Sequence, residues 1–273
     1  MAANLQRKRP VIAIAGNAKA PLKWAGGKRW LVPHLLAYWA KHSAARYVEP
    51  FCGGLSAALG LQPRHALLND SNPHLINFYQ QVQRGLALSI EMRNEEKFFY
   101  RHRERLNELI AGNAFRSAEA AQLFYYLNRT CFNGLCRFNR SGEFNTPFGK
   151  HKSINYATDF AELKAALRDW KFSNVDATRL KLRANDFVYA DPPYDVEFTT
   201  YSAGGFDWGD QVRVAEWLAA HAGPVILSNQ ATDRIVKLYR KLGFTLRFLD
   251  GPRRISCNGD RTAAREVLAM KNV

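Results

Sequence analysis

Residues 187–194 read FVYADPPY, and this stretch decides the fold assignment. Its first four residues form a short apolar run of the kind found in strands that are buried on both faces. Asp191 ends the run, and the two prolines after it fix the backbone and remove two donors. Open α/β sheets bind ligands beyond the carboxyl ends of such strands, so Asp191 is expected at a binding edge.

Similar apolar runs recur along the chain and alternate with helical patterns. We expect further strands at residues 47–51, 66–70, 224–229, 244–248 and 266–269. Helical patterns occupy residues 29–41, 73–83, 211–221 and 233–242. This alternation predicts an α/β fold with a doubly wound, mostly parallel sheet.

The middle of the chain lacks this alternation. Residues 95–111 form a charged helical pattern, and residues 124–152 are rich in Asn, Arg, Gly and aromatic side chains. We therefore expect an inserted, mostly helical domain over 86–170 that carries a β-hairpin loop. Residues 21–85 and 171–273 would form the catalytic, cofactor-binding domain, and residues 1–20 an N-terminal extension.

The charge balance points to a polyanionic partner. Lys and Arg total 39 against 24 Asp and Glu, which gives a net charge of +15. So many positive charges repel one another unless a polyanion such as nucleic acid neutralises them. Binding to an anionic membrane surface, or simple solubility, is the alternative explanation of the charge. No apolar run approaches the roughly 18 residues of a membrane span, so we expect no membrane partner. The run at 11–15 is also too short for a secretory signal.

Cysteine usage favours a reducing compartment. Cys52, Cys131, Cys136 and Cys257 form no C-x-x-C pair, so neither a disulfide framework nor structural zinc is expected. We predict a cytoplasmic protein that needs no metal.

The turn at 191–194 suits the recognition of an amine on a planar ring. The Asp191 carboxylate and the Pro192 carbonyl are two rigid acceptors, Pro193 stiffens the turn, and Tyr194 offers a flat face. Hydrogen bonds to both hydrogens of an exocyclic amine would favour a nitrogen able to attack an electrophile. A purely structural Pro-Pro turn at the end of a strand is the alternative.

A second motif, EPFCGG at residues 49–54, places a glycine turn directly after a predicted strand. Glycines allow a close approach of the backbone to a ligand, and Asp70 lies 17 residues after Gly53, where an acid can bind ribose hydroxyls. The turn is not G-x-G-x-x-G, so a nucleoside-bearing cofactor without a cradled phosphate fits better than a dinucleotide. Glycine turns after strands are also common without any ligand.

A third region, residues 128–150, interleaves basic, aromatic and amide side chains. Arg can read guanine, Asn can bond to bases or phosphates, and Phe can wedge between base pairs. The alternative is a β-hairpin with a solvated basic face.

Taken in order, five motifs resemble the Dam-type DNA adenine-N6 methyltransferases (D12 class, alpha-group). They are PLKWAGGK at 21–28, EPF at 49–51, NGLCR at 133–137, DPPY at 191–194 and RRISCNG at 253–259. The resemblance runs from about residue 21 to residue 270. It implies the sheet of the S-adenosylmethionine-dependent methyltransferases, with S-adenosylmethionine as methyl donor and S-adenosylhomocysteine as product.

The resemblance also implies site residues. Asp191, Pro192, Pro193 and Tyr194 would hold the target base. Asp70 would bind the cofactor ribose, Phe51 would lie against its adenine, and Gly53 would lie near its methionine end. The full expected cofactor set is Lys23, Trp24, Ala25, Gly26, Gly27, Lys28, Glu49, Pro50, Phe51, Gly53, Gly54, Asp70, Asn174, Val175, Asp176 and Asp191.

For DNA, the resemblance implies that Phe132 is a wedge and that Asn133 contacts the vacated space. Leu135, Arg137 and Pro147 would read bases, and Lys23 would reach a base as well. Asn139 and Asn145 would touch phosphates. Arg129 and Lys150 complete the expected DNA-binding set.

The expected function is methyl transfer to N6 of a flipped-out adenine in double-stranded DNA, at GATC or a related site. The alternatives are an RNA adenine-N6 methyltransferase and a catalytically silent DNA-binding regulator. A restriction endonuclease partner and a monomeric or homodimeric state are left open. The chain departs from the family in three respects: Leu55 stands where a third small residue is usual, Phe132 stands where Tyr is frequent, and the extension before Pro21 is longer than usual.

Overall fold

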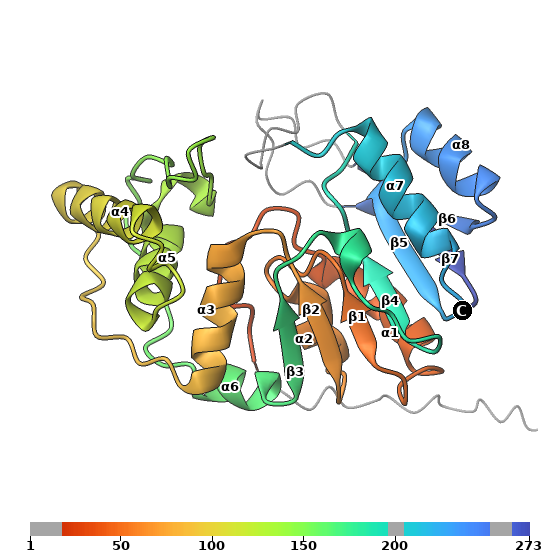
Figure 1. Ribbon diagram of the computed structural model, residues 1–273, viewed down its shortest axis with the longest axis horizontal. Helices are drawn as coiled ribbons and strands as arrows, with labels where there is room; N and C mark the ends of the chain where they lie inside the picture. The colour runs from red at the N-terminus through yellow and green to blue at the C-terminus, as the bar shows by residue number, and fades with distance from the viewer. Residues whose placement is uncertain (1–17, 196–204, 252–263) are drawn as a thin grey trace, which may run out of the picture.

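One seven-stranded sheet forms the centre of the protein (Figure 1). The computed structural model describes residues 18–195, 205–251 and 264–273. The strands are β1 (Tyr47–Glu49), β2 (Ala66–Asn69), β3 (Trp170–Ser173), β4 (Phe187–Ala190), β5 (Val225–Gln230), β6 (Thr245–Gly251) and β7 (Ala264–Lys271). The helices are α1 (Val32–Trp39), α2 (Ser56–Leu61), α3 (Pro73–Arg84), α4 (Glu96–Ala111), α5 (Ala118–Thr130), α6 (Ala161–Leu167), α7 (Trp208–Ala219) and α8 (Asp233–Lys241). Short 3₁₀ turns are η1 (Arg29–Leu31), η2 (Phe132–Gly134) and η3 (Ala177–Arg179).

The strand order is β3-β2-β1-β4-β5-β7-β6. Strands β1 to β5 pair in parallel, and β7 runs antiparallel to both β5 and β6. The order reverses between the neighbouring strands β1 and β4, which makes their carboxyl ends the switch point where ligands bind in open sheets. The predicted doubly wound, mostly parallel sheet is confirmed.

Alternate residues of the strands face two separate cores. Tyr47 and Phe187 lie in one core, whereas their neighbours Val48 and Val188 lie in the other. The first core contains residues of α1, α2, α3, α5 and α6, and the second contains residues of α7 and α8. Strands buried on both faces explain why the sequence shows continuous apolar runs.

The insert lies within the crossover from β2 to β3, where α4 and α5 follow α3. In Figure 1, α3 stands between α5 and the sheet. One side of α5 joins the first core, and the other forms a third core with α4 and the following loop. Phe78 of α3 and Tyr125 of α5 stack with ring centroids 5.5 Å apart and an interplanar angle of 4°. Helix α5 therefore fixes the insert to the sheet domain.

Several elements differ from the sequence expectation. Helices α2, α5 and α6 and strand β3 were not predicted, and residues 124–130 belong to α5 and not to a loop. Helix α5 is buried over most of its length, so it lacks a clear polar face. The expected β-hairpin is reduced to two isolated antiparallel bridges, Cys131–Phe148 and Phe138–Phe144.

Two expectations lie outside the described residues: most of the N-terminal extension, residues 1–17, and the RRISCNG motif at 253–259. Within the described ranges, no helix has both the length and the apolar character needed to cross a membrane. In the same ranges, no cluster of three His, Cys, Asp or Glu side chains is arranged to hold a metal ion.

His74 of α3 makes stability sensitive to acid. Its ring stacks on Phe138 at 4.5 Å, and its Nδ1 is buried with no hydrogen-bond partner within the described part of the chain. Burial lowers the pKa of His74 to about 4, below its ordinary value of 6.5. The unfolded chain therefore binds an additional proton between these values, so stability is complete above pH 6.5 and is lost as the pH falls toward 4.

We predict that lowering the pH from 7 to 5 costs about 2 kcal/mol of unfolding free energy through His74 alone. The variant His74→Phe, which keeps an aromatic ring against Phe138, removes that part of the pH dependence in urea titrations. The exposed His65, changed to Gln, serves as the control. An identical pH slope in His74→Phe and wild type contradicts the prediction.

Candidate active site

The carboxylate of Asp191, directly after β4, is held from two sides. Ser228 of β5 donates its hydroxyl to Asp191 Oδ1 at 2.7 Å, and Lys28 Nζ lies 3.0 Å from Oδ2. The Lys28 ammonium also donates to the Gly26 carbonyl at 2.8 Å. Each carboxylate oxygen keeps a further lone pair, so Asp191 can still accept a hydrogen bond from a ligand.

Tyr194 lies beside this pair. Lys28 Nζ is 4.5 Å from the centre of the Tyr194 ring, and the Tyr194 hydroxyl donates to Glu266 Oε2 of β7 at 2.6 Å. Burial and the neighbouring Asp191 and Glu266 carboxylates raise the pKa of Tyr194 well above its ordinary value. The hydroxyl therefore stays protonated and donating.

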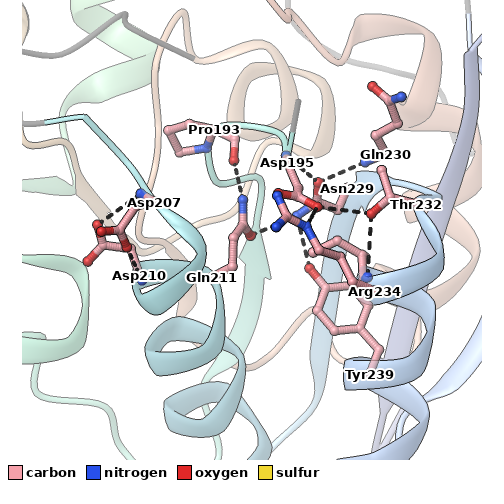
Figure 2. A network of polar contacts seen from close by, with 11 residues as sticks. Pro193, Asp195, Asp207, Asp210, Gln211, Asn229, Gln230, Thr232, Arg234 and Tyr239 are labelled. Carbon is pink, nitrogen blue, oxygen red and sulfur yellow. Dashed lines mark hydrogen bonds and ion pairs between the residues drawn. The ribbon is translucent and has the colours of Figure 1, made fainter. Parts of the chain in front are cut away.

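The two prolines differ in their surroundings. The Pro193 carbonyl accepts from Gln211 Nε2 of α7 at 2.7 Å (Figure 2). Among the described residues, none donates to the Pro192 carbonyl. One carbonyl of the turn is therefore used to anchor it, and the other remains an acceptor.

Next to this turn, both the oxygen and the nitrogen of the Asn229 side-chain amide in β5 form hydrogen bonds (Figure 2). Its Nδ2 donates to Gln211 Oε1 at 2.9 Å and to the Tyr239 hydroxyl at 3.1 Å. Its Oδ1 accepts from the backbone N–H groups of Gln230 at 2.8 Å and Asp195 at 3.3 Å. This fully satisfied buried network fixes the backbone that carries Asp191 and Tyr194.

Asp195 anchors the far end of the turn. Its carboxylate accepts both the Nε of Arg234, at 2.6 Å, and the NH2 of the same guanidinium. Thr232 Oγ1 donates to it at 3.0 Å. Both partners belong to the start of α8, so β5 and α8 together hold the turn in place.

Trp24 covers the glycine turn after β1. A Cβ on Gly53 would lie 2.7 Å from Trp24 Nε1, and one on Gly54 would lie 2.8 Å from Trp24 Cβ. Gly53 also has φ +43°. Leu55, where the resemblance implied a small residue, is fully buried with φ +60° and precedes α2. Glycines are thus required here by the Trp24 side chain itself.

Asp70 lies across the same turn. Its Oδ2 accepts from the Gly53 N–H at 3.1 Å, and its Oδ1 accepts from the Asn72 N–H at 2.9 Å. Burial raises the pKa of Asp70, and these two hydrogen bonds oppose the rise. The structure therefore brings Asp70 and the glycine turn together, as the spacing predicted.

Glu49 ends β1 beside these groups and is almost fully buried. The Tyr47 hydroxyl donates to its Oε2 at 3.1 Å. Burial raises the pKa of Glu49 well above its ordinary value, and the nearby Asp191 and Asp70 carboxylates raise it further. Three acids from three neighbouring strands thus meet at one edge of the sheet.

The segment after β3 is fastened to this edge by Asn69. Asn69 Nδ2 donates to the Pro50 and Val175 carbonyls at 3.0 Å each, and Oδ1 accepts from the Val175 N–H at 3.0 Å. Asn174 Nδ2 donates to the Asp70 carbonyl at 2.8 Å. Val175 is 40% exposed at this point, so its side chain is open to a ligand.

Asp176 is already engaged. It pairs with Arg213 of α7 at 2.7 Å and accepts from the backbone and hydroxyl of Thr178. These contacts, above all that with Arg213, lower the pKa of the carboxyl group. Phe51, which follows β1, meets Phe206 edge-to-face with ring centroids 5.9 Å apart.

Residues 21–28 connect this edge to the insert. Asn128 of α5 is fully buried and grips the backbone of Lys23, accepting from its N–H at 2.9 Å and donating to its carbonyl at 2.7 Å. Lys23 Nζ donates to the Arg129 carbonyl at 3.2 Å. Burial and the Arg129 charge lower the pKa of Lys23. Gly134 packs so closely here that a Cβ would lie 2.4 Å from Lys23 Cβ.

Most of the expected DNA-contacting side chains lie on the surface of the loop after α5. Phe132 is 50% exposed and is one of the few large apolar side chains that are exposed in the described ranges. The other exposed members are Asn133, Arg137, Asn145, Pro147 and Lys150. Leu135 and Asn139 are half-buried, and Asn139 is paired with Glu143 at 2.7 Å. Arg129 is half-buried and donates to the Pro21 carbonyl at 3.3 Å.

Sequence reasoning missed the residues that hold the others in place. These are Ser228 and Asn229 of β5, Glu266 of β7, Asn69 of β2, Asn128 of α5 and Gln211 of α7. The sequence does carry one signal, because a polar pair such as Ser228-Asn229 inside an apolar strand needs partners when buried.

Comparison with known proteins gives a consistent result. Residues 24–249 match the family of D12 class N6 adenine-specific DNA methyltransferases. The retron Ec67 DNA adenine methylase of Escherichia coli is 35% identical over 91% of this chain and 90% of its own length. A DNA adenine methylase of Vibrio cholerae serotype O1 is 34% identical over 92% and 95%. The solved precorrin-6y C5,15-methyltransferase of Geobacter metallireducens matches 88% of each chain with a TM-score of 0.36 and 8% identity, too distant to inform the site.

The contact between Gly134 and Lys23 can be tested with two glycines of the same loop. Gly134 and Gly142 both have positive φ, at +68° and +82°, but a Cβ on Gly142 would meet nothing within 4 Å. We predict that Gly142→Ala costs about 1 kcal/mol of unfolding free energy from backbone strain. Gly134→Ala should cost about 1–3 kcal/mol more, because its methyl group collides with Lys23. Equal costs in chemical denaturation would contradict the close packing of residues 21–28 on the insert.

Proposed function

This chain belongs to the family of D12 class N6 adenine-specific DNA methyltransferases, and we propose how it works and what it reads. As a member, it is a methyltransferase that uses S-adenosylmethionine and acts on adenine in DNA. Our proposal is that it methylates N6 of an adenine turned out of duplex DNA, within GATC or a related adenine-containing site. The observation that carries the proposal is the placement of the Asp191 carboxylate, the Pro192 carbonyl and the Tyr194 ring in one turn.

These three groups match the target amine. The Asp191 carboxylate and the Pro192 carbonyl each accept one hydrogen of the adenine amine, and the Tyr194 ring stacks on the base. The amine of an adenine inside a duplex is paired and stacked, so the adenine must leave the stack to offer both amine hydrogens to this turn. Lys28 and Ser228 hold the carboxylate in position before the substrate arrives.

The reaction needs no covalent intermediate with the protein. When bound, S-adenosylmethionine supplies a methyl carbon on a positively charged sulfur, which keeps the bonding electron pair as the methyl group leaves. N6 forms the new bond with its lone pair and becomes positively charged, and Asp191 stabilises that charge. The Asp191 carboxylate would also accept the proton that N6 then loses.

The cofactor would lie at the ends of β1, β2 and β3. Asp70, which accepts from the Gly53 and Asn72 N–H groups, retains lone pairs for ribose hydroxyls. Phe51 and the partly exposed Val175 would enclose an adenine ring, with Phe206 extending the aromatic wall. The Asp176 carboxylate already binds Arg213 and Thr178, so it would contact the cofactor adenine only through lone pairs that these two residues do not use.

The loop after α5 would read the DNA. Phe132 is exposed as a wedge requires, and Arg137 presents a planar fork that matches the O6 and N7 acceptors of guanine. The exposed Lys150 and the net charge of +15 suit a phosphate backbone. We favour duplex DNA over RNA because the exposed Phe132 and Arg137 suit a wedge and a reader of duplex base pairs. We favour an enzyme over a silent regulator because binding alone needs no amine-holding turn.

The direct test is transfer of labelled methyl groups from S-adenosylmethionine to duplex DNA, single-stranded DNA and RNA, followed by sequencing to locate the methylated base. We expect incorporation into duplex adenines at a fixed sequence. Preferential labelling of RNA, or no labelling of any substrate, would overturn the proposal.

We further predict that Asp191→Ala lowers kcat at least about 100-fold, since preorganised electrostatic contacts of this type contribute roughly 3–4 kcal/mol. Calorimetry should show S-adenosylmethionine affinity within a few-fold of wild type. The exposed Asp169, changed to Asn, is the matched control and should keep full activity. More than about a tenth of wild-type kcat in Asp191→Ala would remove Asp191 from the reaction, because that loss is under about 1.4 kcal/mol.

A further inference from the structure

Tyr194 is held at its far end by a residue to which none of the five motifs assigns a role. Its hydroxyl donates to Glu266 Oε2 at 2.6 Å, while Lys28 lies 4.5 Å from the ring centre. The ring is therefore fixed at its tip and covered on one face. A base can stack only on the face that Lys28 leaves free.

The Glu266 side chain is buried beside a glycine of the neighbouring strand. Glu266 lies in the antiparallel strand β7, opposite Gln230 of β5, and is only 8% exposed. Gly251 of β6 lies beside its side chain, and a Cβ there would come within 2.6 Å of Glu266 Oε1. A buried carboxylate needs hydrogen-bond donors and positive charge, and Tyr194 and Lys28 supply both.

We infer that Glu266 is a positioning residue, which fixes the Tyr194 ring in the orientation that receives the target adenine. The inference rests on the proposed function, since it assigns Tyr194 the stacking role. Glu266 itself touches no reacting atom. It acts through the hydroxyl of Tyr194, whose ring lies 4.5 Å from Lys28 Nζ, and Lys28 also contacts Asp191.

Two features separate this role from a purely structural one. The ladder between β5 and β7 is formed by backbone groups, so it does not depend on the Glu266 side chain. The carboxylate is also directed at one specific hydroxyl. Glu266→Gln keeps an acceptor oxygen for that hydroxyl, whereas Glu266→Ala removes it.

The test measures kcat and KM for methyl transfer to duplex DNA in wild type, Glu266→Gln, Glu266→Ala, Tyr194→Phe and the double variant Glu266→Ala/Tyr194→Phe. We expect Glu266→Ala to lower kcat at least about tenfold, as for loss of a hydrogen bond to a charged acceptor, with KM for S-adenosylmethionine little changed. Glu266→Gln should recover most of that loss. The double variant should be no slower than the slower single variant, because both changes break one contact.

Glu216 of α7 is an exposed acid and provides the matched control as Glu216→Gln, with wild-type kcat expected. The inference would be overturned if the fold-loss of kcat in the double variant equalled the product of the two single losses, or if kcat were unchanged in Glu266→Ala. Circular dichroism and thermal melting of each variant exclude unfolding as the cause of a loss.

A second readout does not depend on methyl transfer. With 3-fluorotyrosine placed at residue 194, we expect the fluorine resonance to shift and sharpen in Glu266→Ala and to stay near the wild-type position in Glu266→Gln and Glu216→Gln. An unchanged resonance in Glu266→Ala would overturn the inference. If wild type transfers no methyl group, the proposed function fails, and the fluorine signal still decides whether Glu266 holds the ring.

Discussion

The ion pair between Lys28 and Asp191 is the contact on which the arrangement of the site depends. Their side chains are 6% and 17% exposed, and the charged atoms are 3.0 Å apart. A charge removed from water in this way is strongly destabilising unless it is paired, so each residue constrains the other. Asp191 belongs to the sheet and Lys28 to the segment before α1. The pair therefore fixes that segment against the carboxyl end of β4.

Residues 21–28 extend the same constraint to the rest of the protein. At one end Asn128 grips the Lys23 backbone from the insert, and in the middle Trp24 lies against Gly53 and Gly54. At the other end Lys28 reaches Asp191 and Tyr194. One short segment thus contacts the expected DNA-reading, cofactor-binding and base-holding regions. A shift of α5 relative to the sheet would therefore reach the Asp191 carboxylate through these contacts.

The sequence predicted the parts that follow from local pattern. Apolar runs such as 187–190 indicated the strands, and the position of Asp191 after such a run placed it at the binding edge. It did not predict β3, whose WKFS sequence has only one fully buried residue, or α5, which is buried on nearly all sides and so lacks helical periodicity. Ser228, Glu266 and Asn128 were missed for another reason. Their roles arise from contacts between elements far apart in the chain, which no local spacing encodes.

The most direct test of this account is amide hydrogen exchange at residues 21–28, compared between wild type and Asn128→Ala in the full chain. Asn128 bonds to both the N–H and the carbonyl of Lys23, and among the described residues its hydrogen bonds involve neither Lys28 nor Asp191. The account predicts faster exchange at the Lys23 amide, whose N–H donates to Asn128 Oδ1, together with a lower kcat for methyl transfer to duplex DNA. Unchanged protection of this segment and an unchanged kcat would contradict it.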